Sequence, residues 1–394
     1  MSLFGDSSLW NAVWVVLLVV MAFFGTRLMF YQIFWKLAQT ANMLEGLAIG
    51  GKRIVIRRIT KNPTKQLNDA VNNFLEVFAI EPISLDPFGI VKKIEHIYNL
   101  SERKFKYFVK DIAPKLDSES QANLVMGVSG AVSLNQISKI VRHYVETIRK
   151  TKNLQLAMVL QMQLPMIERI SRALLKGTEA LTNGWPLGDS IGPMVAANLI
   201  GDSNTKEIEE DVLLARKKIK GKNVLIMKAK GPGGRLGKLG KAVEKLVKRG
   251  KIAKIITVDA AAKLEGERTG SIAEGVGVAI GGIGVDRNYI ENITTAKEIP
   301  LDAIAIKMSQ EEAIMPMKLE VLNSIFKVTK LLEDNISKTR ERGSIILVGV
   351  GNSSGIGNNK KALEEAEKQI RKNVRTMRER ELQEKKEFRI FTEQ

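Results

Sequence analysis

The chain has 394 residues, and its 61 Lys and Arg against 43 Asp and Glu give a formal net charge of +18 at pH 7. It contains no cysteine and only 2 histidines, which excludes disulfide bonds, thiol catalysis, Cys-ligated zinc and a His-rich metal site. A basic chain favours anionic partners such as lipid headgroups, phosphorylated ligands or nucleic acid, and charge alone does not choose among them.

The N-terminal segment 7–26 is dominated by apolar residues and has no ionisable side chain. About 20 such residues, at about 1.5 Å each, cross the roughly 30 Å hydrocarbon core of a bilayer, so we expect one transmembrane helix within residues 1–30. Trp14 near one end and Trp35 beyond the other are typical of interfacial aromatic belts. Because every Lys and Arg follows this segment, the positive-inside rule predicts a single-pass protein of the cell membrane, with its N-terminus outside and its body cytoplasmic.

Beyond the span we expect a juxtamembrane segment, 31–60, and an α-helical domain, 61–204. Basic and β-branched residues mix in 52–59 (KRIVIRRI), which predicts a short strand or a surface-bound stretch. In the helical domain apolar residues recur at helix spacing, as in 137–148, and the Asp-Pro pair at 86–87 predicts a break between two helices.

Residues 205–358 read as an α/β domain, because short β-rich runs alternate with helical runs, which predicts a largely parallel sheet. The expected strands are 223–229, 252–258, 302–308 and 344–350, and the expected helices are 205–222, 239–248 and 319–338. A long charged helix in 359–394 has a weak heptad seam that fits either a homo-oligomer contact or a solvated helix. The predicted fold class is therefore membrane-anchored α plus α/β.

The glycine-rich segment 231–240 (GPGGRLGKLG) joins an expected strand to an expected helix. Such a turn lets backbone N–H groups and the helix N-terminus approach a phosphate. It matches neither the Walker A nor the G-x-G-x-x-G pattern, so a tight turn with solvent-facing basic residues stays as the alternative. The candidate ligand-binding residues are Gly231, Gly233, Gly234, Arg235 and Lys238.

A second glycine-rich segment, 269–284 (TGSIAEGVGVAIGGIG), has a loose G-x-G-x-x-x-G spacing, which adds Gly275, Gly277 and Gly281 to these candidates. Asp259 stands at the carboxyl end of an expected strand, where the ligands of open α/β sheets collect. A carboxylate set there could hold Mg²⁺ with a nucleotide or act in acid–base catalysis. Its members are Asp259, Glu265, Glu267 and Asp286. The alternative is a packing hairpin with surface ion pairs.

A third glycine-rich segment, 349–357 (GVGNSSGIG), looks like the cofactor loop of short-chain dehydrogenases. Only one expected helix follows it, and no tyrosine occurs after Tyr289, so the downstream Tyr-x-x-x-Lys of those enzymes is absent. No histidine follows His143, which leaves Ser353 and Ser354 without a nearby base in the sequence. The sequence therefore assigns no catalytic residue.

The apolar N-terminal span, the Asp86-Pro87-Phe88-Gly89 turn and the segment 259–286 (DAAAKLEGERTGSIAEGVGVAIGGIGVD) together resemble an archaeal family catalogued as a membrane-anchored domain of unknown function. The resemblance covers most of the chain. It implies an archaeal cell membrane and no particular activity.

The sequence favours a membrane-tethered module that binds a phosphorylated small molecule, such as a nucleotide, through its glycine-rich loops. Two alternatives stay open: a metal-dependent hydrolase that uses the carboxylates near Asp259 and Asp286, and a non-catalytic scaffold that recruits partners or self-associates. Membrane lipid is an expected partner, and nucleic acid is the less favoured one.

Overall fold

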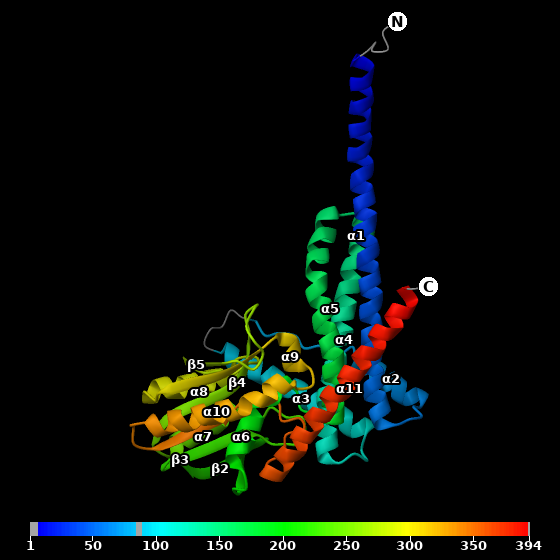
Figure 1. The fold of residues 1–394 in the computed structure, drawn as a ribbon. Coiled ribbons are helices and arrows are strands. Elements are labelled where there is room, and N and C mark those ends of the chain that lie inside the picture. The colour runs from blue at the N-terminus through cyan, green and yellow to red at the C-terminus, as the bar shows by residue number, and fades with distance from the viewer. Residues whose placement is uncertain (1–6, 84–88, 393–394) are drawn as a thin grey trace. The chain divides into compact units, whose positions relative to one another are not determined.

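The computed structural model describes residues 7–83 and 89–392, which form two compact units. Unit 1 comprises residues 1–50 and 133–172, and unit 2 comprises 51–132 and 173–394. Three long helices have one part in each unit, namely α1 (Ser7–Ile59), α4 (Ser118–Thr151) and α5 (Leu154–Asn183) (Figure 1). Of the turn predicted at 86–89, residues Asp86, Pro87 and Phe88 lie outside the described residues.

Unit 1 is a bundle in which α1 packs against the hairpin of α4 and α5. Its core consists of apolar residues that recur at helix spacing on the three helices, among them Phe30, Leu37, Leu44, Val145, Ile148, Leu160 and Leu164. Arg142 joins α4 to α1, since its Nε donates to Glu45 Oε1 at 2.6 Å and its Nη2 donates to Asn42 Oδ1 at 2.5 Å. The apolar stripes predicted on these helices therefore face one another.

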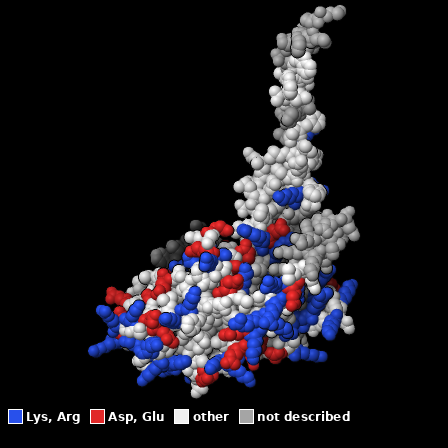
Figure 2. Space-filling view, in the orientation of Figure 1, with Lys and Arg blue, Asp and Glu red and all other residues white. Residues whose placement is uncertain are grey.

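The N-terminal part of α1 lies outside that core. From Trp10 to Met29 the described side chains are exposed although nearly all are apolar, with Trp10 68% and Phe24 66% exposed. In Figure 2 the described atoms of this part carry almost no charge. Several side chains of the segment, such as those of 20–23, lie outside the described residues.

By length and composition, α4 is the one helix among the described residues that is apolar enough to cross a membrane. Half of its most apolar window is buried inside the protein, as in the core helix of a folded domain. We therefore assign α4 to the helical core rather than to a membrane.

The helical part of unit 2 consists of the end of α1, α2 (Lys65–Phe74), α3 (Ile90–Ile112) and the start of α4. The rings of Phe74 and Phe108 stack with their centroids 3.8 Å apart. The strand or surface-bound stretch predicted at 52–59 is wrong, because this segment forms the last turns of α1. Val55 and Ile56 are buried there in the same apolar cluster.

A seven-stranded mixed sheet forms the centre of unit 2, in the order β1-β2-β3-β7-β4-β6-β5. Its bounds are β1 (Thr205–Glu209), β2 (Val212–Ile219), β3 (Lys222–Ala229), β4 (Ile252–Ala262), β5 (Ile272–Val276), β6 (Leu301–Met308) and β7 (Ser344–Gly349). The middle strands β3, β7, β4 and β6 are parallel, and β1, β2 and β5 pair antiparallel at the edges. The predicted parallel sheet is thus confirmed for its centre.

Helices cover both faces of this sheet (Figure 1). On one face lie α7 (Leu239–Arg249) and α8 (Val285–Lys297). On the other lie α6 (Ile191–Ile200), α10 (Leu319–Lys338) and the start of α11 (Lys360–Thr392), while the short α9 (Gln310–Ile314) follows β6. Residues of β3, β7 and β4 alternate between the two apolar clusters, so these strands are buried on both faces, as strands of parallel sheets are. The buried residues of β6, namely Ile304, Ile306 and Met308, all belong to the cluster that includes α6 and α10.

The charged helix predicted at 205–222 is wrong, because this segment forms the antiparallel pair β1 and β2. The first half of β2, from Val212 to Ala215, is buried, and its basic residues Arg216, Lys217 and Lys218 are exposed in the second half. Since β2 pairs with β3 along its whole length, the strand is stabilised by ladder hydrogen bonds that its charged composition does not reveal.

Candidate functional site

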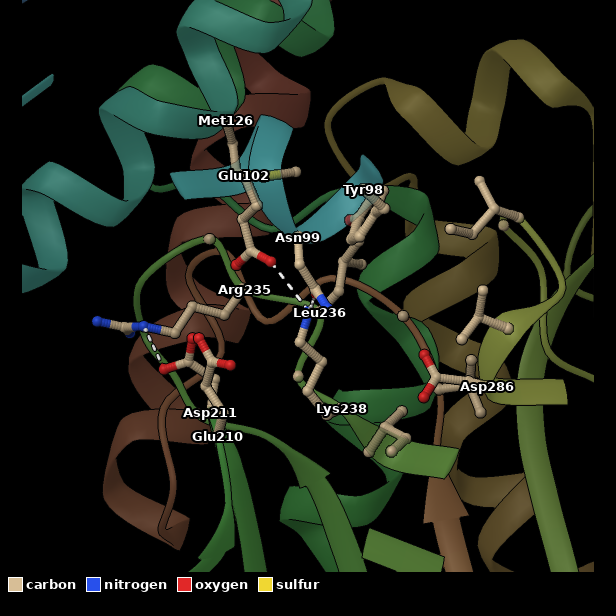
Figure 3. A pocket seen from close by; sticks show the side chains of 18 of the residues that line it. Tyr98, Asn99, Glu102, Met126, Glu210, Asp211, Arg235, Leu236, Lys238 and Asp286 are labelled. Atoms are coloured by element: carbon tan, nitrogen blue, oxygen red, sulfur yellow. Dashed lines mark hydrogen bonds and ion pairs between the residues drawn. The ribbon is translucent and has the colours of Figure 1, made fainter. Parts of the chain in front are cut away.

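A cavity of about 820 Å³ lies in unit 2 at the carboxyl ends of β3, β4 and β7. Residues of α3 and the start of α4 complete its wall (Figure 3). The chain leaves β3 toward the face that carries α7, and it leaves the neighbouring strand β7 toward the opposite face, which carries α11, whereas β4 continues into the edge strand β5. Such a change of direction is where open α/β sheets bind their ligands.

Three aspartates from separate segments line this cavity: Asp189, Asp259 and Asp286. Asp259, at the carboxyl end of β4, is 4% exposed. Its Oδ1 accepts a hydrogen bond from Ala260 N at 2.7 Å, and its Oδ2 accepts one from Gly281 N at 3.1 Å. Burial, followed by the charge of Asp189, raises the pKa of Asp259 to about 8.

Asp189 lies in a short 3-10 turn, Gly188–Ser190, directly before α6. Its Oδ2 accepts a hydrogen bond from Asn352 N at 2.8 Å, and burial raises the pKa of its carboxyl group. Gly351 passes so close to this turn that a Cβ there would lie 2.0 Å from the carbonyl oxygen of Asp189. Glycine at 351, with a φ of 127°, therefore lets the loop after β7 meet Asp189.

Asp286 lies in the first turn of α8, and its Oδ1 accepts a hydrogen bond from Gly240 N at 2.7 Å. Burial is the main cause that raises the pKa of this carboxyl group, although Lys238 and Lys241 act in the opposite sense. Among the described residues, none of the three aspartates forms an ion pair. The three carboxyl groups therefore line one cavity where burial favours a retained proton or an added cation, although they are not a group whose oxygens all lie within 4.8 Å of one another.

Lys238 and Lys241 of the cavity pair with carboxylates of the helical part instead, and Figure 3 shows Lys238 near Asn99 and Glu102. Lys238 Nζ lies 3.1 Å from Glu102 Oε2 and donates to Asn99 Oδ1 at 2.6 Å. Lys241 Nζ lies 2.5 Å from Glu95 Oε1. These ion pairs join the start of α7 to α3, so neither lysine is a spare cation for a ligand.

The first glycine-rich loop likewise holds a carboxylate of its own chain. Gly233 N donates to Glu119 Oε2 at 2.6 Å, and Arg235 binds both oxygens of Glu119, at 2.6 and 3.0 Å. Gly234 N donates to Asn123 Oδ1 at 2.7 Å. The loop therefore has the anion-binding donors that its sequence predicts, and α4 occupies them. Gly231 lies beside it, where its N–H group donates to Asn358 Oδ1 at 3.0 Å.

The other predicted site residues divide between the cavity and its surroundings. Gly281 lines the cavity, as Asp259 and Asp286 do, whereas Gly275 and Gly277 do not. Glu265 and Glu267 lie in the loop between β4 and β5 and are not among the lining residues, and Glu267 forms an ion pair with Lys307. The structure thus brings together half of the predicted carboxylate set.

The sequence did not point to Asp189, Glu102 and Asp211, which line the cavity from distant segments, or to Glu119, which binds the first glycine-rich loop. Glu102, Glu210 and Asp211 form a carboxylate group whose oxygens lie within 4.8 Å of one another. Basic residues already balance this group, since Lys106 lies 2.8 Å from Glu102 and Arg235 lies 3.2 Å from Asp211. The three aspartates, by contrast, line the cavity without an ion pair among the described residues.

The raised pKa of Asp259 predicts an unusual dependence of stability on pH. An unfolded aspartate ionises near pH 4, whereas Asp259 in the folded protein keeps its proton up to about pH 8. Between these values the folded state binds more protons, so the free energy of unfolding falls as pH rises. Asp259→Asn removes this pH-dependent fall in the free energy of unfolding. We therefore expect its Tm to lie about 2–4 °C above that of the wild type at pH 8, with little difference at pH 4.

Thermal denaturation of the full-length protein at the two pH values measures this effect. Glu265→Gln, at an exposed carboxylate outside the cavity, is the matched control and should leave the Tm unchanged at both. A lower Tm for Asp259→Asn at pH 8 would show that the carboxyl group is ionised and stabilising, contrary to this account.

Comparison with protein-family models gives a match for each of two consecutive parts of the chain. Residues 11–184 match the model described as "Protein of unknown function (DUF1512) N-terminal domain", and residues 187–357 match "Domain of unknown function (DUF1512) C-terminal". The chain belongs to the DUF1512 family, which confirms the predicted membership of a family of unknown function. Neither the curated proteins nor the solved structures include a match.

Proposed function

We propose that this protein is a membrane-tethered module whose cavity binds a small phosphorylated ligand together with a divalent cation. The N-terminal part of α1 is the tether, and the body is cytoplasmic. The observation that carries the ligand proposal is the cavity with Asp189, Asp259 and Asp286, whose carboxyl groups have raised pKa values and no ion pair among the described residues. Carboxylate oxygens are the ligands that Mg²⁺ prefers.

Backbone donors for a phosphate lie at the second glycine-rich loop. Gly281, Gly282 and Gly284 line the cavity, and a Cβ at any of them would meet nothing within 4 Å. No described residue accepts a hydrogen bond from the N–H groups of Gly282, Ile283 or Gly284, which directly precede α8. Because the positive end of a helix dipole also lies there, a phosphate bridged by the cation to Asp259 would fit.

The exposed apolar side chains at the start of α1 support its role as the tether. Apolar side chains such as those of Val16, Leu18 and Phe24 are between 60% and 70% exposed on one helix that begins the chain. Exposed apolar surface of this extent is typical of a membrane or protein interface. The cytoplasmic side follows from the distribution of Lys and Arg, and the archaeal source stays a prediction from the resemblance.

Acid–base hydrolysis is a second candidate, because burial and the charge of Asp189 raise the pKa of Asp259 to about 8. Burial raises the pKa of Asp189 as well, although Asn352 N donates a hydrogen bond to its carboxylate. A carboxyl group that keeps its proton at neutral pH can act as a general acid. Release of phosphate from a bound ligand would favour this candidate over simple binding.

A thermal-shift screen of the full-length protein in detergent tests the proposal. Nucleotides, sugar phosphates and pyrophosphate are added with and without MgCl₂. At 100-fold excess over its Kd, a ligand should stabilise the folded state by about 2.7 kcal/mol, and we expect this shift only when Mg²⁺ is also present. Absence of any shift across the panel would reject the ligand proposal and leave the scaffold as the better account.

A further inference from the structure

The α4–α5 hairpin of unit 1 ends in a rigid, basic tip, which we define as residues 149–153. Helix α4 ends at Thr151, and Lys152, with a φ of 54°, reverses the chain. Asn153 Oδ1 then accepts a hydrogen bond from Leu156 N at 2.9 Å and so caps α5. Because only two residues join the helices and both ends are capped, the tip has a defined position on the bundle.

The tip lies where the exposed apolar part of α1 ends. Lys152 Nζ is 5.6 Å from the centroid of the Phe30 ring. Phe30 is the first buried side chain of α1 among the described residues, and it belongs to the same core cluster as Ile148 and Ala157, on either side of the tip. The described side chains that precede it, from Trp10 to Met29, are all exposed.

Near Phe30, α1 and the hairpin tip carry types of side chain that favour a membrane interface. Tyr31 and Trp35 are 61% and 65% exposed, and such aromatic residues favour the headgroup region. Lys150 and Lys152 are exposed, and neither forms an ion pair with a described residue. Arg149 is the exception, because it lies 2.8 Å from Glu146.

We propose that the hairpin tip is a second membrane-contact site, in which Lys150 and Lys152 bind the phosphates of anionic lipid headgroups next to the point where α1 enters the bilayer. This inference rests on the proposed tether and goes beyond it, because a spanning helix alone requires no contact between the hairpin and lipid. About 20 helical residues precede Phe30, enough to cross the hydrocarbon core and place the tip at its surface.

The absence of cysteine from the chain allows a direct test with single labels. Full-length Asn153→Cys carries an environment-sensitive fluorophore and is reconstituted in vesicles that contain phosphatidylglycerol and a lipid with a spin-labelled headgroup. Gln163→Cys is the matched control, because it is also exposed on α5 but lies about 15 Å further from the tip. We expect the spin label to quench position 153 strongly and position 163 little.

Charge is tested on the same labelled protein. The double substitution Lys150→Glu and Lys152→Glu should abolish the difference in quenching between phosphatidylglycerol and neutral vesicles, whereas Lys150→Arg with Lys152→Arg should keep it. Equal quenching at 153 and 163 in protein that stays with the vesicles after a high-salt wash would overturn the tip contact and leave the tether intact. Protein that leaves the vesicles in that wash would overturn both. RNA retention is measured on the same two variants. If the glutamate variant keeps the quenching pattern of the wild type but no longer retains RNA, the tip binds nucleic acid and not lipid.

Discussion

Deletion of residues 1–26 is expected to release the protein from membranes in high salt, even though the remaining body keeps all of its basic residues. The removed segment supplies the exposed apolar side chains of α1, whereas Phe30 and Ile33 belong to the buried core of unit 1 and are retained. Hydrophobic insertion of the segment resists salt, but headgroup attraction is screened at high ionic strength. Sedimentation of membranes in low and high salt measures the difference.

The wild type should pellet with membranes under both conditions, and the truncated protein should be soluble in high salt. Weak, salt-sensitive pelleting of the truncated protein in low salt would agree with a contact at the hairpin tip. Retention of the truncated protein in high salt would contradict the account, because it would require a second inserted segment. Circular dichroism of the soluble fraction confirms that the body has folded.

Gly192→Ala is expected to lower the stability of the protein strongly. Helix α6 is almost entirely buried against the sheet, and a Cβ at 192 would lie 2.1 Å from Val350 O and 2.5 Å from Val258 O. Both contacts are with backbone, which cannot rotate away. Overpacking of this kind costs about 1–3 kcal/mol or more, so we expect Tm to fall by at least about 6 °C.

Gly250→Ala, directly after α7, is the control for a glycine of unit 2 at which a Cβ would meet nothing within 4 Å. Its φ of −158° is open to any residue. Because Val258 and Val350 directly precede Asp259 and Gly351, Gly192→Ala should also distort the cavity. A stable Gly192→Ala protein with unchanged thermal shifts would show that α6 does not hold these strand ends in place.

The parallel centre of the sheet was predictable from sequence because its strands are short apolar runs. Strands β3, β4, β6 and β7 each have this composition, and helices of amphipathic pattern separate some of them. Strands β1 and β2 were not predictable in the same way, because the antiparallel pair at one side of the sheet carries charged residues that are exposed to solvent. Segment 52–59 was missed because β-branched residues in a buried helix give the same pattern as a strand.

The site was predictable only where its residues follow a strand directly. Asp259 follows the core of β4, and Gly281 and Asp286 belong to the segment that leads from β5 into α8. Asp189 lies some 70 residues earlier, beyond any local pattern, and reaches Asp259 only through the packing of α6 on the sheet. Likewise, sequence spacing predicts that the loop 231–240 can hold an anion, but tertiary structure decides that the anion is Glu119.

Electron paramagnetic resonance of Mn²⁺ tests the central claim, a cation-dependent ligand cavity, most directly. Mn²⁺ has oxygen ligand preferences like those of Mg²⁺, and the signal of the free ion is lost when it binds. The ion is titrated into full-length wild type, Asp259→Asn and Glu265→Gln, each with and without a phosphorylated compound that gives a thermal shift. We predict tight binding of one ion in the wild type and in Glu265→Gln when the compound is present, and its loss in Asp259→Asn. Equal binding by all three proteins, or no binding by the wild type, would contradict the assignment of Asp259 to a cation site.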